Sequence, residues 1–318
     1  MHRFARHVTG QTQKVLWAKK TCIPEVLVVG NLTVGGAGKT PIVLGVCEFA
    51  RRFGKQVGIV SRGYGRSDTG AALLETGGTP DPALFGDEPV WLHQQTACPV
   101  AVGANRAEAL ALLLQHHPEV DLVVSDDGLQ HHQLPRSMEW AVFDDRGAGN
   151  GHLLPAGPLR EDLDRLESVN AVLASNLSVH ELAHLLGRPA GDNWHEVEVS
   201  ITGFRQHSTG QFLHAHEASQ KWLGQRLLAF SGLGNPRKFF KGLEGLGLIP
   251  IETVPLPDHH HYPAGFCEGL HADVLLTTGK DAVKLPRYDL RLWVAEVHVS
   301  LPTSLEHTLR KALGLPTD

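Results

Sequence analysis

A candidate phosphate-binding loop is the part of this sequence with the most recognisable chemistry. The stretch VVGNLTVGGAGKTP runs from apolar residues through glycines to Lys39 and Thr40. Glycines let a backbone close around an anion, a lysine reaches the outer phosphates, and the adjacent hydroxyl can ligate magnesium. The usual pattern is G-x-x-x-x-G-K-[ST], and a threonine stands here at the first glycine position. The alternative is a purely structural glycine-rich turn. The nucleotide-binding residues that we predict are Thr33, Gly35, Gly36, Ala37, Gly38, Lys39 and Thr40.

Two adjacent carboxylates, Asp126 and Asp127, directly follow the apolar run VDLVVS. Nucleoside triphosphatases place a carboxylate at the end of such a strand, where it holds magnesium directly or through water. The alternative is a surface Asp-Asp-Gly turn. Together with Thr40, these residues predict a magnesium site beside the phosphate loop.

Two further residues could act on a hydroxyl acceptor. Asp87, in GDEP, could take a proton from an attacking hydroxyl, although an aspartate at this kind of position also commonly caps a helix. His259, in the Pro-bounded segment PDHHHY, could steer or polarise such a base. Either residue alone also has an ordinary structural explanation.

The elements that must position these residues alternate along the chain. Apolar runs predict strands at 26–30, 56–65, 99–103, 120–128, 140–144 and 171–176, and helical periodicity predicts helices at 41–53 and 106–115. This pattern is typical of a P-loop nucleoside-triphosphatase-like α/β fold, a parallel sheet with helices on both faces. Ligands collect at the carboxyl ends of such strands, so the phosphate loop, SRGYGR and SDDGLQHH are expected to meet there.

The length of 318 residues favours two domains. The segment from about 176 to 220 is polar and loop-like, and LLAFSGLGNP after it begins a new strand-and-turn unit. We expect a nucleotide-binding P-loop kinase domain over 1–176. A second, smaller α/β domain over 177–318 would contribute to the active-site cleft, with its last segment able to pack back on the first domain.

Composition limits the classes of function. The net charge of -5, with both signs interspersed, does not favour nucleic acid as a partner. Four scattered cysteines without C-x-x-C spacing fit a reducing cytoplasm, and the twenty histidines lack the i, i+4 spacing of a helical zinc site. No apolar run reaches the roughly 20 residues that span a bilayer. The basic and apolar residues 1–20 could form a short interfacial helix or an ordinary helix leading into the first strand.

The motifs together resemble one family. GNLTVGGAGKTP, SRGYGR, GDEP, SDDGLQHH, GNGHLLPAGPLRE, SGLGNPRKFF and PDHHHY occur in the order and approximate spacing of the tetraacyldisaccharide 4′-kinases of lipid A biosynthesis. The resemblance implies two α/β/α domains and ATP-dependent transfer of phosphate to the 4′-hydroxyl of a tetraacyl disaccharide 1-phosphate. It also implies a cytoplasmic enzyme at the cytoplasmic face of the inner membrane.

The resemblance also implies roles for residues. Lys39 and Thr40 would bind ATP and Mg2+, Asp126 and Asp127 would serve the metal, and Asp87 would act as base with His259 as its partner. The acceptor side would be lined by Gln130, His131, Arg160, Arg62 and Arg106.

The expected partners are the lipid disaccharide and, peripherally, the inner membrane, with protein partners unknown. The short segment before Pro24 weakens the expectation of membrane contact. The sequence also departs from the family at Gly279, where the family often has a glutamate in Thr-Glu-Lys-Asp.

Two other functions would also use a phosphate loop. A GTP-driven metallochaperone usually needs Asn/Thr-Lys-x-Asp for guanine, and here Lys280 and Asp281 are adjacent. A partitioning-type ATPase switch carries a lysine immediately before the two glycines, where this chain has Val34. Both patterns are therefore incomplete.

Overall fold

The computed structural model describes residues 24–75, 77 and 80–316. The helix considered for residues 1–20 lies outside these ranges. The chain separates into two compact units. The first runs to Glu198 and resumes at Val299, and the second is Val199–His298.

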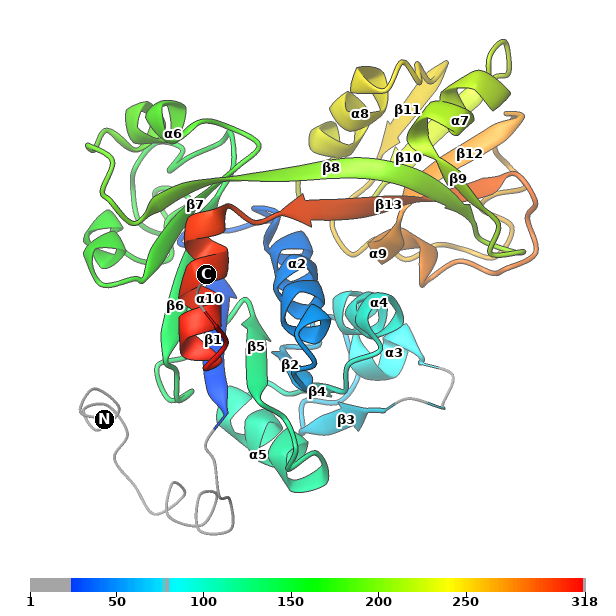
Figure 1. Ribbon diagram of the computed structural model, residues 1–318. Coiled ribbons are helices and arrows are strands. Elements are labelled where there is room, and N and C mark those ends of the chain that lie inside the picture. The colour runs from blue at the N-terminus through cyan, green and yellow to red at the C-terminus, as the bar shows by residue number, and fades with distance from the viewer. Residues whose placement is uncertain (1–23, 76, 78–79, 317–318) are drawn as a thin grey trace. The chain divides into compact units, whose positions relative to one another are not determined.

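The first unit is built on a parallel sheet with the strand order β8-β7-β6-β1-β5-β2-β4-β3 (Figure 1). Among the described strand pairs of this unit, only the edge pair, β3 with β4, is antiparallel. Its complete strands are β1 (Glu25–Gly30), β2 (Val57–Ser61), β3 (Ala72–Leu74), β4 (Val100–Val102), β5 (Leu122–Asp126), β6 (Met138–Phe143) and β7 (Ala171–Ser175). The central strands are buried along nearly their whole length, which is why they read as continuous apolar runs.

Helices cover both faces of this sheet, as predicted. Strand residues alternate between faces, and Val26 and Val28 pack in one cluster with α5 and α6. On α2, Arg52 pairs with Glu306 of α10. The helices of this unit are α2 (Lys39–Arg52), α3 (Pro82–Phe85), α4 (Asp87–Thr96), α5 (Arg106–His116), α6 (Val179–Leu186), α10 (Thr303–Ala312) and the 3-10 turn η1 (Leu163–Glu167).

The parallel register brings the chemistry-bearing segments to one edge of the sheet. Val29 is level with Asp126 and Ser61 is level with Val102, so β1, β5, β2 and β4 end side by side. The phosphate loop, the Asp-Asp pair and Arg62 all leave the sheet at this edge, as the rule for parallel sheets predicts.

The strands of the second unit pair in the order β11-β10-β12-β13-β8, and β9 pairs with β8 beside this path. Strands β8 (Trp194–Gln206) and β13 (Leu292–Ser300) each have residues in both units. The other elements are β9 (Phe212–His214), α7 (Ala215–Lys221), β10 (Leu227–Ser231), α8 (Pro236–Gly245), β11 (Glu252–Pro255), β12 (Val274–Thr278) and α9 (Gly279–Ala282).

The expectation of a loop-like segment over about 176–220 is wrong. This segment contains α6, the long strand β8, β9 and α7. Most residues of β8 are partly or fully exposed, yet Val197, Val199 and Ile201 alternate with polar residues, which is the two-residue period of a half-buried strand. The sequence therefore carried this signal, and the prediction overlooked it. The domain boundary expected at 176 falls between β7 and α6, inside the first unit.

A tight contact between β2 and α5 offers a test of this packing. A Cβ added to Gly58 would lie 2.7 Å from a methyl carbon of Leu113, which is fully buried. We expect Gly58→Ala to lower the free energy of unfolding by about 1–3 kcal/mol and Leu113→Ala by about 2–5 kcal/mol. Denaturant unfolding of the double variant should show a loss smaller than the sum. Strictly additive losses would contradict this packing.

Candidate active site

The phosphate loop joins β1 to α2 with two left-handed glycines. Gly35 has φ of 88° and Gly38, the residue preceding α2, has φ of 83°. Among the described side chains none caps the amino end of α2, and its first turn carries no acidic residue. A helix start of this kind presents N–H groups and a positive dipole to an anion. Thr33, at the unusual position, accepts a hydrogen bond from Asn31 Nδ2 at 3.1 Å.

Lys39 is held inside this loop by two partners. Its Nζ donates to Asn31 Oδ1 at 3.0 Å and lies 3.4 Å from Asp127 Oδ1. The lysine is only 9% exposed, so its ammonium is positioned before any nucleotide arrives. The sequence analysis did not single out Asn31, although this residue lies within the loop motif.

An arginine after β6 braces the same loop. Arg146 Nη2 donates to the carbonyl of Gly36 at 2.6 Å, and its Nε is shared between the two oxygens of Asp144 at 3.0 and 3.1 Å. Farther along, Val34 N donates to the carbonyl of Pro158 at 2.8 Å. The segment 146–160 therefore fixes the loop through hydrogen bonds to backbone carbonyls. Pro158 lies within the motif GNGHLLPAGPLRE, whereas Arg146 precedes it.

Asp126 has the surroundings of a cation ligand. The Thr40 hydroxyl donates to its Oδ2 at 3.4 Å, and its buried Oδ1 has no hydrogen-bond partner among the described residues. Burial and then the nearby Glu88 carboxylate raise the pKa of Asp126 to about 7. A buried oxygen without a partner, beside a hydroxyl, fits a hard cation.

The described residues contain no group of three or more His, Cys, Asp or Glu side chains that could hold a metal ion. Magnesium bound with a nucleotide often takes only one or two carboxylates and completes its shell with phosphates and water. Asp126 and Thr40 are therefore sufficient protein ligands for an Mg2+ ion that is bound together with a nucleotide.

Asp127 faces different neighbours, although it is the next residue. It has φ of 50°, and both of its oxygens accept from Arg160 Nη1 at 3.0 Å. Burial opposes its charge, but Lys39 and Arg160 outweigh burial and lower the pKa of Asp127. Asp127 is thus a permanent counter-ion at the base of the loop.

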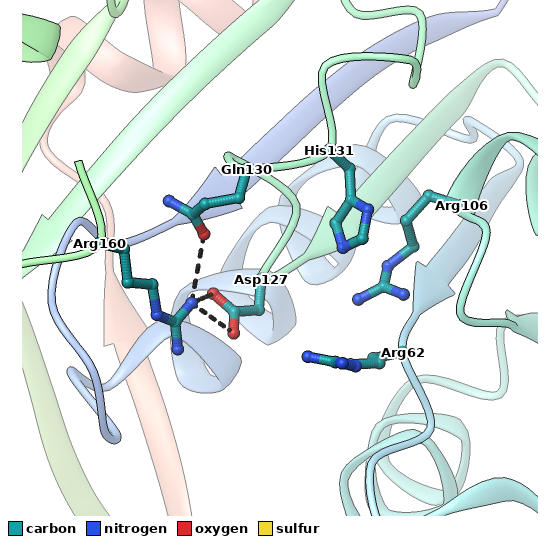
Figure 2. A pocket seen from close by; sticks show the side chains of 6 residues that line it. All are labelled: Arg62, Arg106, Asp127, Gln130, His131 and Arg160. Atoms are coloured by element: carbon teal, nitrogen blue, oxygen red, sulfur yellow. Dashed lines mark hydrogen bonds and ion pairs between the residues drawn. The ribbon is translucent and has the colours of Figure 1, made fainter. Parts of the chain in front are cut away.

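A pocket of about 220 Å³ opens beside this carboxylate (Figure 2). All five residues that were predicted for the acceptor side line this pocket. They come from four places in the chain: just after β2, the start of α5, the turn after β5 and the end of the segment 146–160. Three guanidinium groups against one carboxylate favour an anionic ligand. The lining residues are Arg62, Arg106, Asp127, Gln130, His131 and Arg160.

Burial and charge tune two residues of this pocket. Arg106 is 1% exposed and donates to the carbonyl of Gly103 at 2.6 Å, and burial lowers its pKa to about 10, which leaves it charged at neutral pH. Burial, followed by the charges of Arg106 and Arg62, lowers the pKa of His131 to about 4. His131 is therefore a neutral hydrogen-bonding group at pH 7.

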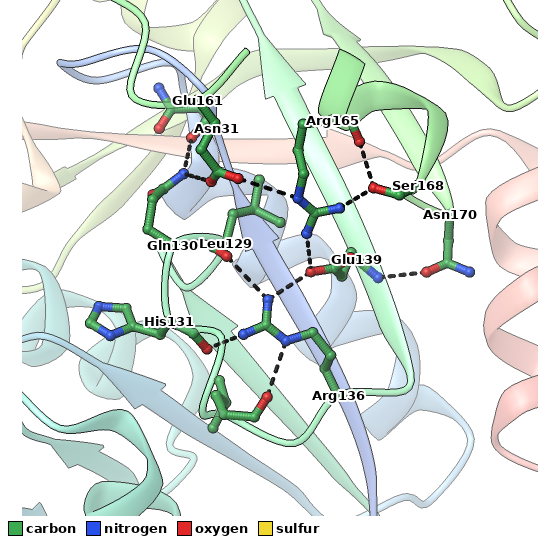
Figure 3. Close-up of polar contacts among 11 residues, drawn as sticks. Asn31, Leu129, Gln130, His131, Arg136, Glu139, Glu161, Arg165, Ser168 and Asn170 are labelled. Carbon is green, nitrogen blue, oxygen red and sulfur yellow. Dashed lines mark hydrogen bonds and ion pairs between the residues drawn. The ribbon is translucent and has the colours of Figure 1, made fainter. Parts of the chain in front are cut away.

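An ion-pair network holds the turn between β5 and β6 that carries Gln130 and His131 (Figure 3). Arg136 Nη1 donates to Glu139 Oε1 at 2.6 Å, and the guanidinium also donates to the carbonyl of His131. Arg165 donates to the same Glu139 oxygen at 2.5 Å. Gln130 is thereby kept in position to accept from Arg160 at 3.2 Å.

Asp87 is the first residue of α4 and not part of a loop. It is 5% exposed, and its Oδ1 accepts from the N–H of Glu88 at 2.9 Å. The Glu88 carboxylate, next in the chain, raises the pKa of Asp126, and α4 packs against α2, the helix that follows the phosphate loop. Sequence reasoning missed Glu88.

His259 belongs to the second unit, in the turn between β11 and β12. It has φ of 58°, and its Nε2 lies 3.3 Å from Lys280 Nζ. The pairing of Asp87 with His259 stays a prediction.

Comparisons with known proteins agree on one family. The family described as Tetraacyldisaccharide-1-P 4'-kinase matches residues 3–314. A tetraacyldisaccharide 4'-kinase of Dechloromonas aromatica is 42% identical over 91% of this chain and 84% of its own length. One of Bordetella petrii is 38% identical over 90% and 82%. A crystal structure of LpxK from Aquifex aeolicus in complex with ATP has a TM-score of 0.73 and 26% identity, covering 93% of this chain and 90% of that one.

The Arg146 brace leads to a prediction for nucleotide affinity. A hydrogen bond from a charged group contributes about 1.5–3 kcal/mol, so we expect Arg146→Ala to weaken ATP binding about tenfold. Isothermal titration calorimetry would measure this loss. Arg188→Ala, which removes an ion pair with Asp164 and a hydrogen bond to the carbonyl of Leu163 in the same unit, is the matched control and should bind ATP normally. Unchanged affinity in Arg146→Ala would show that the brace is dispensable.

Proposed function

We infer the roles of the site residues from one premise: the chain belongs to the tetraacyldisaccharide-1-P 4'-kinase family. It is an ATP-dependent phosphotransferase of lipid A biosynthesis, with the 4′-hydroxyl of a tetraacyl disaccharide 1-phosphate as acceptor. The observation that carries the residue assignments is the position of Asp127, which contacts Lys39 and also lines the arginine-rich pocket. A donor site and an acceptor site would thus share this one carboxylate.

On the donor side, Lys39 and the N–H groups at the start of α2 would hold the ATP phosphates. Thr40 and Asp126 would hold Mg2+, and the orphaned Asp126 oxygen supports this assignment. When bound, Mg2+ neutralises charge on the transferring phosphoryl group. Phosphoryl transfer depends mainly on positioning and on cations, and Lys39 supplies both.

On the acceptor side, the pocket would receive the polar sugar end of the lipid. Arg62, Arg106 and Arg160 would balance the negative charge of the phosphoryl group and its acceptor. Gln130 and the neutral His131 would hydrogen-bond sugar hydroxyls without adding charge. The mixture of charged and neutral donors suits a sugar beside a phosphate.

For proton removal we assign Asp87 as the general base and His259 as the histidine that assists it. The transition state is loose, so the hydroxyl proton leaves late. A positioned general base typically contributes about 10²–10⁴-fold to the rate. The burial of Asp87 at the start of α4, a helix that packs against α2, supports this role.

Separating donor binding from proton removal tests these assignments. Lys39→Ala should abolish turnover and weaken ATP binding, because it removes the ammonium from the phosphate loop. Asp87→Asn should lower turnover by about 10²-fold or more and leave ATP affinity unchanged. Transfer of labelled γ-phosphate to the tetraacyl acceptor, with ATP titrations alongside, measures both. Near-normal turnover of Asp87→Asn would remove Asp87 as the base.

We also propose peripheral contact with the inner membrane. Within the described ranges no helix is long and apolar enough to span a bilayer. An apolar turn nevertheless projects beside the acceptor pocket: Leu153 and Leu154 are 47% and 53% exposed. Leu154 N donates to the carbonyl of Leu159 at 2.8 Å, and Leu159 immediately precedes Arg160 of the pocket. Acyl chains beside a bound sugar would find apolar surface there.

Replacing both leucines tests this contact. Leu153→Ser/Leu154→Ser should reduce co-sedimentation with anionic phospholipid vesicles and raise KM for the vesicle-borne acceptor several-fold, while KM for ATP stays the same. Leu223→Ser, at an 85% exposed leucine of the second unit, is the control. Equal losses in both variants, or none in the first, would refute a specific role for this turn.

A further inference from the structure

A buried lysine next to His259 has no role in the assignments above. Lys280 is the second residue of α9 and is 5% exposed. Its Nζ donates to Asp258 Oδ1 at 2.8 Å and lies 3.3 Å from His259 Nε2. Burying an ammonium is costly unless it is paired and hydrogen-bonded, so these contacts are expected to be well ordered.

The neighbouring Asp281 fixes the frame around this lysine. Its fully buried carboxylate accepts from Tyr262 Oη at 2.8 Å, from Thr278 Oγ1 at 2.7 Å and from Gly232 N at 3.1 Å. One side chain therefore ties the end of β10, the start of α9 and the His-containing turn together. Lys280 therefore extends toward the turn from the start of α9, which these hydrogen bonds hold in place.

The contact also fixes the chemistry of the imidazole. An ammonium has donors and no acceptor, so His259 Nε2 must accept from Lys280. In a neutral ring that accepts this bond, the proton is on Nδ1. Asp258 Oδ1 lies 3.8 Å from the same Nε2, but it is closer to Lys280, whose charge it balances.

We propose that Lys280 is a positioning residue for the 4′-kinase reaction, which holds the His259 imidazole in one orientation and one tautomer through Nε2. The inference rests on the proposed role of His259 in assisting the base. Lys280 touches neither ATP nor lipid in this scheme. It acts on the rate only through the histidine.

The test is a double-mutant cycle in the full-length enzyme, with Lys280→Met, His259→Ala and the combined variant. A misplaced catalytic group can cost about 10²-fold in rate, so we expect Lys280→Met to lower kcat by about 10-fold to 100-fold. KM for ATP and for the lipid should be unchanged. Because Lys280 acts through His259, the combined variant should be no slower than His259→Ala alone.

Conservative replacements separate positioning from general support of the fold. Lys280→Arg and Lys280→Gln keep a donor, so both should retain more activity than Lys280→Met at a similar thermal midpoint. They also keep the test usable if Lys280→Met fails to fold. Lys241→Met, at an exposed lysine of α8, and His261→Ala, at an exposed histidine of the same turn, are the matched controls and should turn over normally.

The possible failures can be told apart. Normal turnover of His259→Ala would refute the proposed role of His259 itself. A slow His259→Ala together with a normal Lys280→Met would overturn only the inference about Lys280. Multiplying losses in the combined variant would likewise overturn it, because Lys280 would then act independently of the histidine.

Discussion

The ion pairs of Asp127 are the interaction on which the rest of the first unit's site depends. Lys39 approaches this carboxylate from the phosphate loop, and Arg160 approaches it from the segment after β6. Without a negative charge between them, the two cations would repel each other in a largely buried region, where solvent screens charge poorly. Asp127 lets both stay in place, so a site for anions is preformed in the protein alone.

The contrast between Asp126 and Asp127 shows how neighbouring residues of the same type can differ. The strand ends between them, and the left-handed conformation of Asp127 directs the two side chains into different surroundings. Burial and Glu88 raise the pKa of Asp126, whereas cations lower that of Asp127. One carboxylate suits a metal that arrives with the nucleotide, and the other is a fixed counter-ion.

The sequence predicted the family, the parallel sheet and the residues that meet at its carboxyl edge, because strand ends in such a sheet converge wherever they lie in the chain. It did not predict Arg146 or the Arg136–Glu139 network. Arg146 and Arg136 donate largely to backbone carbonyls, and only the folded distances reveal such contacts. Strand β8 was missed although Val197, Val199 and Ile201 alternate with polar residues, because only continuous apolar runs were taken as strands. The roles of Asp87 as general base and of His259 as its assisting histidine stay predictions, because they concern proton transfer during the reaction.

The left-handed backbone at Asp127 limits what can replace it. Asparagine tolerates this conformation, whereas alanine or glutamate pays a steric penalty unrelated to charge. An alanine scan would therefore mix a distorted turn with a missing counter-ion. The same backbone conformation means that asparagine or glycine at this position would remove the charge and leave the turn unstrained.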